Sequence, residues 1–120
     1  MEKIIKLVCA DDNDAICFNP KHVNYIANLG KKTQVGVEAL TINVKASWDK
    51  IRKLFHAREF TEFVQVGGTI NVLVNADRII EWHEQDDGVL LELGDDRVVV
   101  QGTLEEVTAK IEKALEGCAS

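Results

Sequence analysis

The 120-residue sequence contains little of what marks secreted, membrane-bound or disulfide-stabilised proteins. It has one proline and three cysteines without a CxxC pair, so we expect reduced thiols rather than a disulfide framework. No segment approaches the roughly 18 apolar residues that a membrane span needs, and the first residues lack the apolar stretch of a signal peptide. These absences predict a cytoplasmic protein without a membrane partner.

Compositions that favour disorder are also missing. With 8 glycines, 1 proline and 46% hydrophobic residues, the chain has no low-complexity tract and no linker. A chain of this length can bury one core but not two independently stable ones. We therefore expect a single folded domain over residues 1–120.

Positive charge is scarce overall and unevenly distributed. The formal net charge is −6, which argues against nucleic-acid binding over the whole surface, since such binding depends on Lys and Arg. Residues 1–57 hold 9 basic and 6 acidic residues, a net +3, whereas residues 58–120 hold 5 and 14, a net −9. A nucleic-acid partner is therefore not expected, although the first half is basic.

The two halves of the chain share a pattern. A shift that superposes Asn19 on Asn75 aligns residues 4–54 with residues 60–110 without a gap. Identical residues are few, so the shared order of short apolar segments carries the interpretation. The other identities are Val8 with Val64 and Val44 with Val100.

Turns and helix starts punctuate both halves. Short apolar segments predict strands, and turn-forming residues separate them. Asn19 and Asn75 follow strands, where an Asn side chain can accept a hydrogen bond from the backbone ahead of it. Ser47 and Thr103 stand at N-cap positions before amphipathic helices, and Thr103 with Glu106 predicts a capping box.

The fold class predicted from this order is α+β, with two tandem β-rich repeats at residues 1–57 and 58–117. Each repeat has about five short strands plus one C-terminal helix. Because so small a unit cannot bury its apolar face alone, we expect the repeats to pack as a pseudo-twofold pair. Their open sheet edges also favour self-association.

The first half resembles the short flagellar FlbD family, and the second half resembles it more loosely. The matching residues of the first half are Asn19, Pro20 and Val23, then Val44-Lys45-Ala46-Ser47 leading to Ile51. Those of the second half are Asn75, Ile79, Val100 and Thr103. The resemblance implies a hairpin-rich fold closed by a helix, and it implies no catalytic residues.

Residues 23–82 resemble the LytTR type of DNA-binding domain. Strands, the helix SWDKIRKLF, an Arg-Glu-Phe stretch and the segment VNADRII follow one another as in that family. A His-Arg-Ser element precedes Val-Asn in LytTR domains, whereas this chain has Val66-Gly67-Gly68-Thr69 there, without a basic residue. Because that element would supply phosphate and base contacts, the resemblance implies a shared topology alone.

Two groups of residues suggest metal ligands, but neither has a recognised spacing. An EF-hand that began at Asp11 would need a glycine at its sixth position and a glutamate at its twelfth, where Ile16 and His22 stand. Cys9, Cys17 and His22 follow no known zinc pattern. We expect no metal, no cofactor and no catalytic residues.

Aromatic and polar residues near the middle of each half form a candidate ligand-binding set. Glu81 and His83 share one face of a predicted strand. Tyr25 and Trp82 could stack on a ligand in a groove between the halves, with His83 as a polar group. An exposed row of polar side chains is the alternative interpretation of Glu81 and His83.

The basic residues of the first half form a candidate interaction surface. The set consists of Lys31 and Lys32 together with Lys50, Arg52 and Lys53, which lie on one predicted helix away from its apolar stripe. A solvated helix face is the alternative interpretation of the helix residues. Their charge complements the acidic half of a neighbouring molecule. We therefore predict head-to-tail self-association.

The leading functional hypothesis is a non-catalytic accessory protein that acts as a homo-oligomer. The first alternative is a small-molecule-binding protein or enzyme that uses the groove between the repeats. The second alternative is a nucleic-acid-binding module that uses the first helix.

Overall fold

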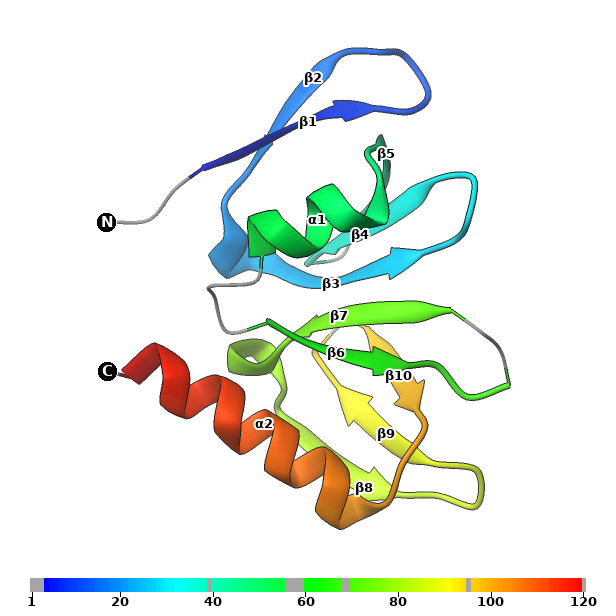
Figure 1. Cartoon of the computed structure of the whole chain (residues 1–120), viewed down its shortest axis with the longest axis vertical. Helices are drawn as coiled ribbons and strands as arrows, with labels where there is room; N and C mark the ends of the chain where they lie inside the picture. Colours follow the sequence, from blue (N-terminus) through cyan, green and yellow to red (C-terminus); the bar gives the residue numbers. More distant parts are fainter. Residues whose placement is uncertain (1–3, 39, 56–59, 68–69, 95, 120) are drawn as a thin grey trace.

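The computed structural model describes residues 4–38, 40–55, 60–67, 70–94 and 96–119. These ranges form antiparallel sheets, two α-helices and two short 3-10 turns, η1 and η2 (Figure 1). The first half contains β1 (Ile5–Cys9), β2 (Ala15–Phe18), η1 (Pro20–His22), β3 (Val23–Asn28), β4 (Thr33–Val37), β5 (Leu40–Lys45) and α1 (Trp48–Phe55). The second half contains β6 (Phe60–Val64), β7 (Asn71–Asn75), η2 (Ala76–Arg78), β8 (Glu81–Glu84), β9 (Val89–Glu92), β10 (Arg97–Val100) and α2 (Leu104–Ala119). No helix in the described ranges is long and apolar enough to cross a membrane.

Seven strands from both halves form one sheet. Its order is β2-β1-β5-β4-β3-β7-β6, and a three-stranded sheet has the order β10-β9-β8. β3 pairs with β7, placing Ile26 opposite Leu73, so the larger sheet crosses the predicted boundary between residues 57 and 58. The predicted fold of two tandem repeats packed as a pseudo-twofold pair is therefore wrong. The two repeats do not form separate units because β7 pairs with the edge of β3. This pairing satisfies backbone groups that a self-contained unit would leave unpaired.

The described residues bury two apolar clusters on opposite faces of β3 and β7. Successive residues of a strand point to opposite faces, and Ile26 and Leu73 lie in one cluster whereas Ala27 and Val72 lie in the other. The two halves therefore do not pool their apolar faces in one core. Each cluster also includes residues of one helix. Ile51 and Phe55 of α1 lie in the cluster of Ile26, and Val107 and Ile111 of α2 lie in the cluster of Ala27.

The predicted Asn turns and the predicted capping box are confirmed. Asn19 and Asn75 precede η1 and η2, and the Oδ1 of each accepts a hydrogen bond from the amide two residues ahead, at 3.1 and 3.0 Å. At the start of α2, Thr103 Oγ1 accepts from the amide of Glu106 at 3.1 Å, and Glu106 Oε1 accepts from the amide of Thr103 at 2.9 Å. These reciprocal bonds satisfy amides that a helix start leaves free.

Buried asparagines join the two halves of the chain. Asn24 in β3 donates through Nδ2 to Asp96 Oδ2 at 2.8 Å and accepts through Oδ1 from Arg78 Nε at 2.7 Å. Asn75 at the end of β7 donates through Nδ2 to the carbonyl of Val23 at 3.0 Å. Because an unsatisfied buried amide is destabilising, these bonds favour one relative arrangement of the halves.

Candidate functional site

The turn between β3 and β4 carries two exposed lysines, Lys31 and Lys32. The amide of Leu29 donates to the carbonyl of Lys32 at 3.0 Å and closes the turn. Gly30 has φ +90, and its amide donates to Asn28 Oδ1 at 3.1 Å. Glycine adopts this left-handed conformation without the strain that a side chain would cause, so the local sequence fixes the turn that presents the lysines.

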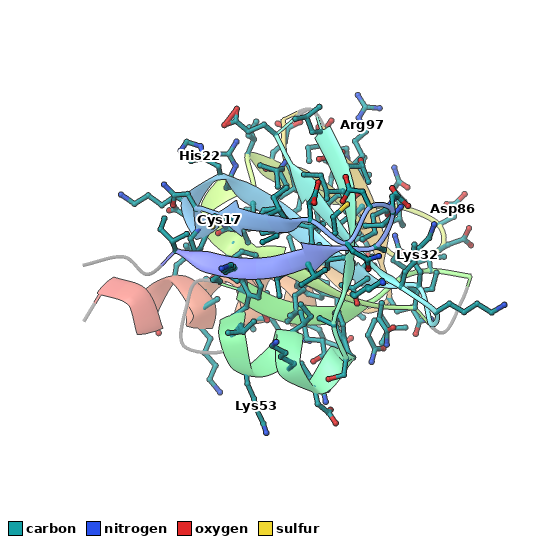
Figure 2. All side chains as sticks on the ribbon, turned by 90° about the horizontal axis from the view of Figure 1, so that it is seen from above. Cys17, His22, Lys32, Lys53, Asp86 and Arg97 are labelled. Carbon is teal, nitrogen blue, oxygen red and sulfur yellow. The ribbon has the colours of Figure 1, made fainter. Side chains whose placement is uncertain are left out.

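Helix α1 presents lysines on the side away from its buried stripe. Ser47 Oγ accepts a hydrogen bond from the amide of Lys50 at 3.2 Å and caps the helix start. Ile51 and Phe55 are fully buried, and their spacing directs one side of the helix to the sheet. Lys50 and Lys53 are exposed, and Figure 2 shows Lys53 pointing away from the body of the protein.

Arg52, a member of the predicted interaction surface, is held by an acidic residue of the same molecule. Its Nε and Nη2 donate to the two carboxylate oxygens of Glu62 in β6, at 2.9 and 3.1 Å. Such a bidentate contact is among the stronger side-chain hydrogen bonds, and it raises the pKa of Arg52. Arg52 is therefore already engaged by a carboxylate of β6.

The β3–β4 turn lies beside the start of α1. Thr33 pairs with Val44 across β4 and β5, and its hydroxyl donates to the carbonyl of Ala46 at 3.3 Å. This contact holds the base of the turn against Ala46, two residues before α1, and Figure 2 shows Lys32 and Lys53 at separate places on the surface. We name these four residues the basic surface, and none of them forms an ion pair with a carboxylate of the described residues: Lys31, Lys32, Lys50 and Lys53.

Three members of the predicted ligand-binding set, Glu81, Trp82 and His83, are divided between the two faces of β8, and Tyr25 lies in β3. Trp82 is half-buried against the α2 cluster, and its Nε1 donates to Thr108 Oγ1 at 2.8 Å. Tyr25 packs against the same cluster, and burial raises the pKa of its phenol. Glu81 and His83 point to the other face, because neighbouring strand residues alternate. Stacking of a ligand on Tyr25 and Trp82 stays a prediction, and it would not involve the polar pair directly.

Glu92 of β9 lies beside Glu81 and His83, a contact that the sequence analysis missed. Strand register sets Glu81 opposite Glu92, and His83 Nε2 lies 3.5 Å from Glu92 Oε2 and 3.9 Å from Glu81 Oε1. A hydrogen bond between the two carboxyl groups raises the pKa of Glu81 and lowers that of Glu92. Asp86, Asp87 and Gly88 are turn-forming residues, and counting strand positions outward from them pairs Glu81 with Glu92.

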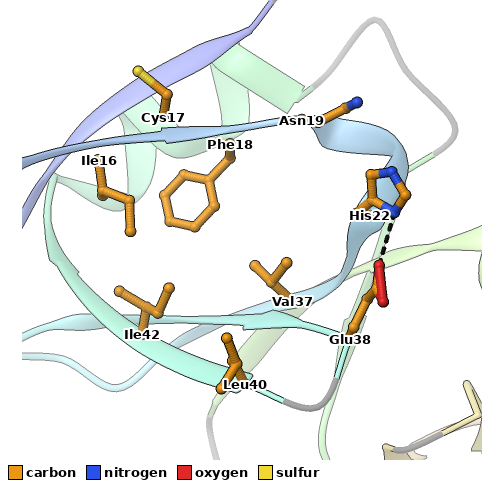
Figure 3. A pocket seen from close by; sticks show the side chains of 9 residues that line it. All are labelled: Ile16, Cys17, Phe18, Asn19, His22, Val37, Glu38, Leu40 and Ile42. Atoms are coloured by element: carbon orange, nitrogen blue, oxygen red, sulfur yellow. Dashed lines mark ion pairs between the residues drawn. The ribbon is translucent and has the colours of Figure 1, made fainter.

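A mainly apolar pocket of about 330 Å³ lies between β2 and the β4–β5 hairpin (Figure 3). Val37 and Leu40 line one side of it, and an ion pair of 2.9 Å between His22 Nδ1 and Glu38 Oε1 lies at one end. Cys17 is exposed on its wall. The volume is at the lower end of the range for small-molecule sites, and the pocket is lined by none of the four residues of the predicted ligand-binding set.

Comparison with known proteins adds a likeness of fold. No protein-family model and no curated protein matches the chain. A similar solved structure is the LytTR DNA-binding domain of a protein described as a methyl-accepting/DNA response regulator from Bacillus cereus, with a TM-score of 0.63 and 22% sequence identity. The match covers 96% of this chain and 98% of that domain, and the comparisons do not show the FlbD likeness. Over nearly its whole length, the chain has the fold of a LytTR DNA-binding domain.

Proposed function

We propose that this chain is a DNA-binding module without catalytic activity of its own. The observation that carries the proposal is its likeness, over nearly the whole of both chains, to a domain described as DNA-binding. The net charge of −6 had argued against a nucleic-acid partner. Charge distribution answers that objection, because the basic surface lies in the half of the chain with 9 basic and 6 acidic residues.

The basic surface supplies the phosphate contacts in this proposal. Its four lysines are exposed and form no ion pair with a described carboxylate, so DNA binding would break no such contact. Each neutralised phosphate adds about −0.9 to the slope of log K against log salt, so four contacts give a slope of about −3.6. Affinity should then fall about 150-fold between roughly 50 and 200 mM salt.

Direct base recognition is not part of the proposal. Bases are read by side chains that enter a groove with hydrogen-bond donors or acceptors. Of Val66-Gly67-Gly68-Thr69, which stand at the position of the LytTR His-Arg-Ser element, only Thr69 has a polar side chain and none is basic. We therefore expect duplexes of different sequence to bind alike, with dissociation constants on the order of micromolar at low salt.

Fluorescence anisotropy with a labelled duplex of about 20 base pairs, roughly two helical turns, tests the proposal. Lys53→Glu should weaken binding at low salt, and Lys50→Glu combined with it should lower the salt slope to about −1.8, because two contacts remain. Lys113→Glu is the matched control, since Lys113 is also an exposed helix lysine but lies on α2. Its affinity should equal that of the unchanged protein.

Two results would contradict the proposal. One is the absence of duplex binding by the unchanged protein at about 50 mM salt, where phosphate contacts are strongest. The other is an equal loss of affinity in Lys53→Glu and Lys113→Glu, which would show that net charge matters and the basic surface does not. Circular dichroism of each variant separates lost binding from lost folding.

A further inference from the structure

Backbone pairing brings three potential metal ligands together on the outer face of β8 and β9. Glu81 lies directly opposite Glu92 in the strand register, and His83 follows Glu81 by two residues, so all three side chains share one face. Trp82, between them in sequence, packs toward the α2 cluster. The pairing of two strands therefore fixes where the three ligands start, whatever rotamers their side chains adopt.

The separations among these side chains are close to what a zinc ion requires. One nitrogen or oxygen from each of Glu81, His83 and Glu92 lies within 4.8 Å of the others. A tetrahedral zinc site with bonds of about 2.0–2.1 Å holds its ligands roughly 3.3–3.4 Å apart. His83 Nε2 is already 3.5 Å from Glu92 Oε2 and 3.9 Å from Glu81 Oε1. Small side-chain rotations at this exposed face would close the remaining difference.

Electrostatics also favours a cation at this place. Carboxylates directly opposite each other on neighbouring strands repel when both are ionised. Glu81 and Glu92 are such a directly opposite pair. A divalent cation between Glu81 and Glu92 would remove the repulsion.

We propose that Glu81, His83 and Glu92 form a surface binding site for Zn²⁺. An imidazole nitrogen with two carboxylates is a donor set that suits zinc, whereas calcium and magnesium prefer oxygen ligands alone. Three protein ligands leave one tetrahedral position for water. The site is separate from the basic surface, so it stands or falls independently of DNA binding.

Arg97 of β10 competes with the metal for one of its ligands. Its Nε lies 3.2 Å from Glu92 Oε1, and Arg97 is paired with Glu92 in the register of β9 and β10. A fixed positive charge at this distance weakens binding of a cation. Replacing Arg97 by glutamine should therefore tighten zinc binding, the opposite of what loss of a structural contact would do.

Isothermal titration calorimetry of the full chain with zinc chloride tests the proposal. We expect one zinc ion per chain, at least about tenfold weaker binding in His83→Ala, and tighter binding in Arg97→Gln. His22→Ala is the matched control, because His22 is also half-exposed and lies 2.9 Å from a glutamate, Glu38. Cys17→Ser, which removes an exposed thiol, should likewise leave zinc binding unchanged.

Three results would contradict the proposed zinc site. Zinc binding that is equal in the unchanged protein and in His83→Ala would place the ion elsewhere. A loss in His22→Ala or Cys17→Ser would assign it to the wall of the pocket instead. Failure of the unchanged protein to bind zinc at millimolar concentration would show that the three side chains form only an exposed polar group.

Discussion

Asn75 provides a quantitative test of how the two halves of the chain are joined. Its side chain is 1% exposed. Nδ2 donates to the carbonyls of Pro20 and Val23 at 3.3 and 3.0 Å, and Oδ1 accepts from the amide of Asp77 at 3.0 Å. Asn75→Ala removes all three bonds. At about 1 kcal/mol net for each, the free energy of unfolding should fall by about 3 kcal/mol.

Asn19 is the matched control, because it occupies the equivalent place before η1. Its Oδ1 accepts from the amide of Lys21 at 3.1 Å, so Asn19→Ala should lower the free energy of unfolding by about 1 kcal/mol. In a domain of this size about 1 kcal/mol shifts the melting temperature by about 4 °C. The melting temperature should therefore fall by about 12 °C for Asn75→Ala and by about 4 °C for Asn19→Ala. Equal shifts in the two variants would refute the role of Asn75 in joining the halves.

Three further substitutions test the packing and the helix cap. Phe55→Ala should lower the free energy of unfolding by about 3–5 kcal/mol in urea titrations, because Phe55 is fully buried and packs edge-on against Phe60. Gly88→Ala should destabilise by at least about 1–3 kcal/mol in the same assay, since a Cβ there would lie 2.2 Å from the carbonyl oxygen of Val100. Glu106→Ala should destabilise the protein at neutral pH, and its difference in stability from the unchanged protein should shrink in acid. The hydrogen bond from the amide of Thr103 lowers the pKa of Glu106. Its contribution to stability is therefore present when the carboxylate is ionised and is lost as pH falls through the folded-state pKa. Melts across pH measure this difference.

Local structure followed from the sequence because its causes are local. The hydrogen bond that Asn75 Oδ1 accepts from the amide of Asp77 joins residues two apart. The capping box of Thr103 and Glu106 joins residues three apart. The buried stripe of α1, with Ile51 and Phe55, is likewise set by helical spacing. Each of these features could be predicted without knowing what the segment packs against.

Strand pairing between distant segments could not be predicted in this way. The pairing of Ile26 with Leu73 depends on which of several apolar strands offers the best-matched edge and faces, and a period of two residues is the same for all of them. Nor did local pattern show that Asn24 would be buried and bonded to Arg78 and Asp96. These long-range contacts are what unite the halves in one sheet.

The candidate sites show the same division. The exposed lysines of α1 were predictable, because helical spacing separates Lys50 and Lys53 from the buried stripe. Engagement of Arg52 by Glu62 was not, since the two residues belong to different elements whose packing the sequence does not state. The sharing of one face by Glu81 and His83 followed from strand alternation, whereas the third member, Glu92, required the hairpin register.

In the proposed function, the basic surface binds duplex DNA. Its most direct test is an NMR titration of the ¹⁵N-labelled chain with an unlabelled duplex at about 50 mM salt, where phosphate contacts are strongest. We expect the amide shifts to concentrate in the turn at residues 29–32 and in α1. Shifts concentrated in the acidic β8–β9 hairpin, or a spectrum unchanged by DNA, would contradict it.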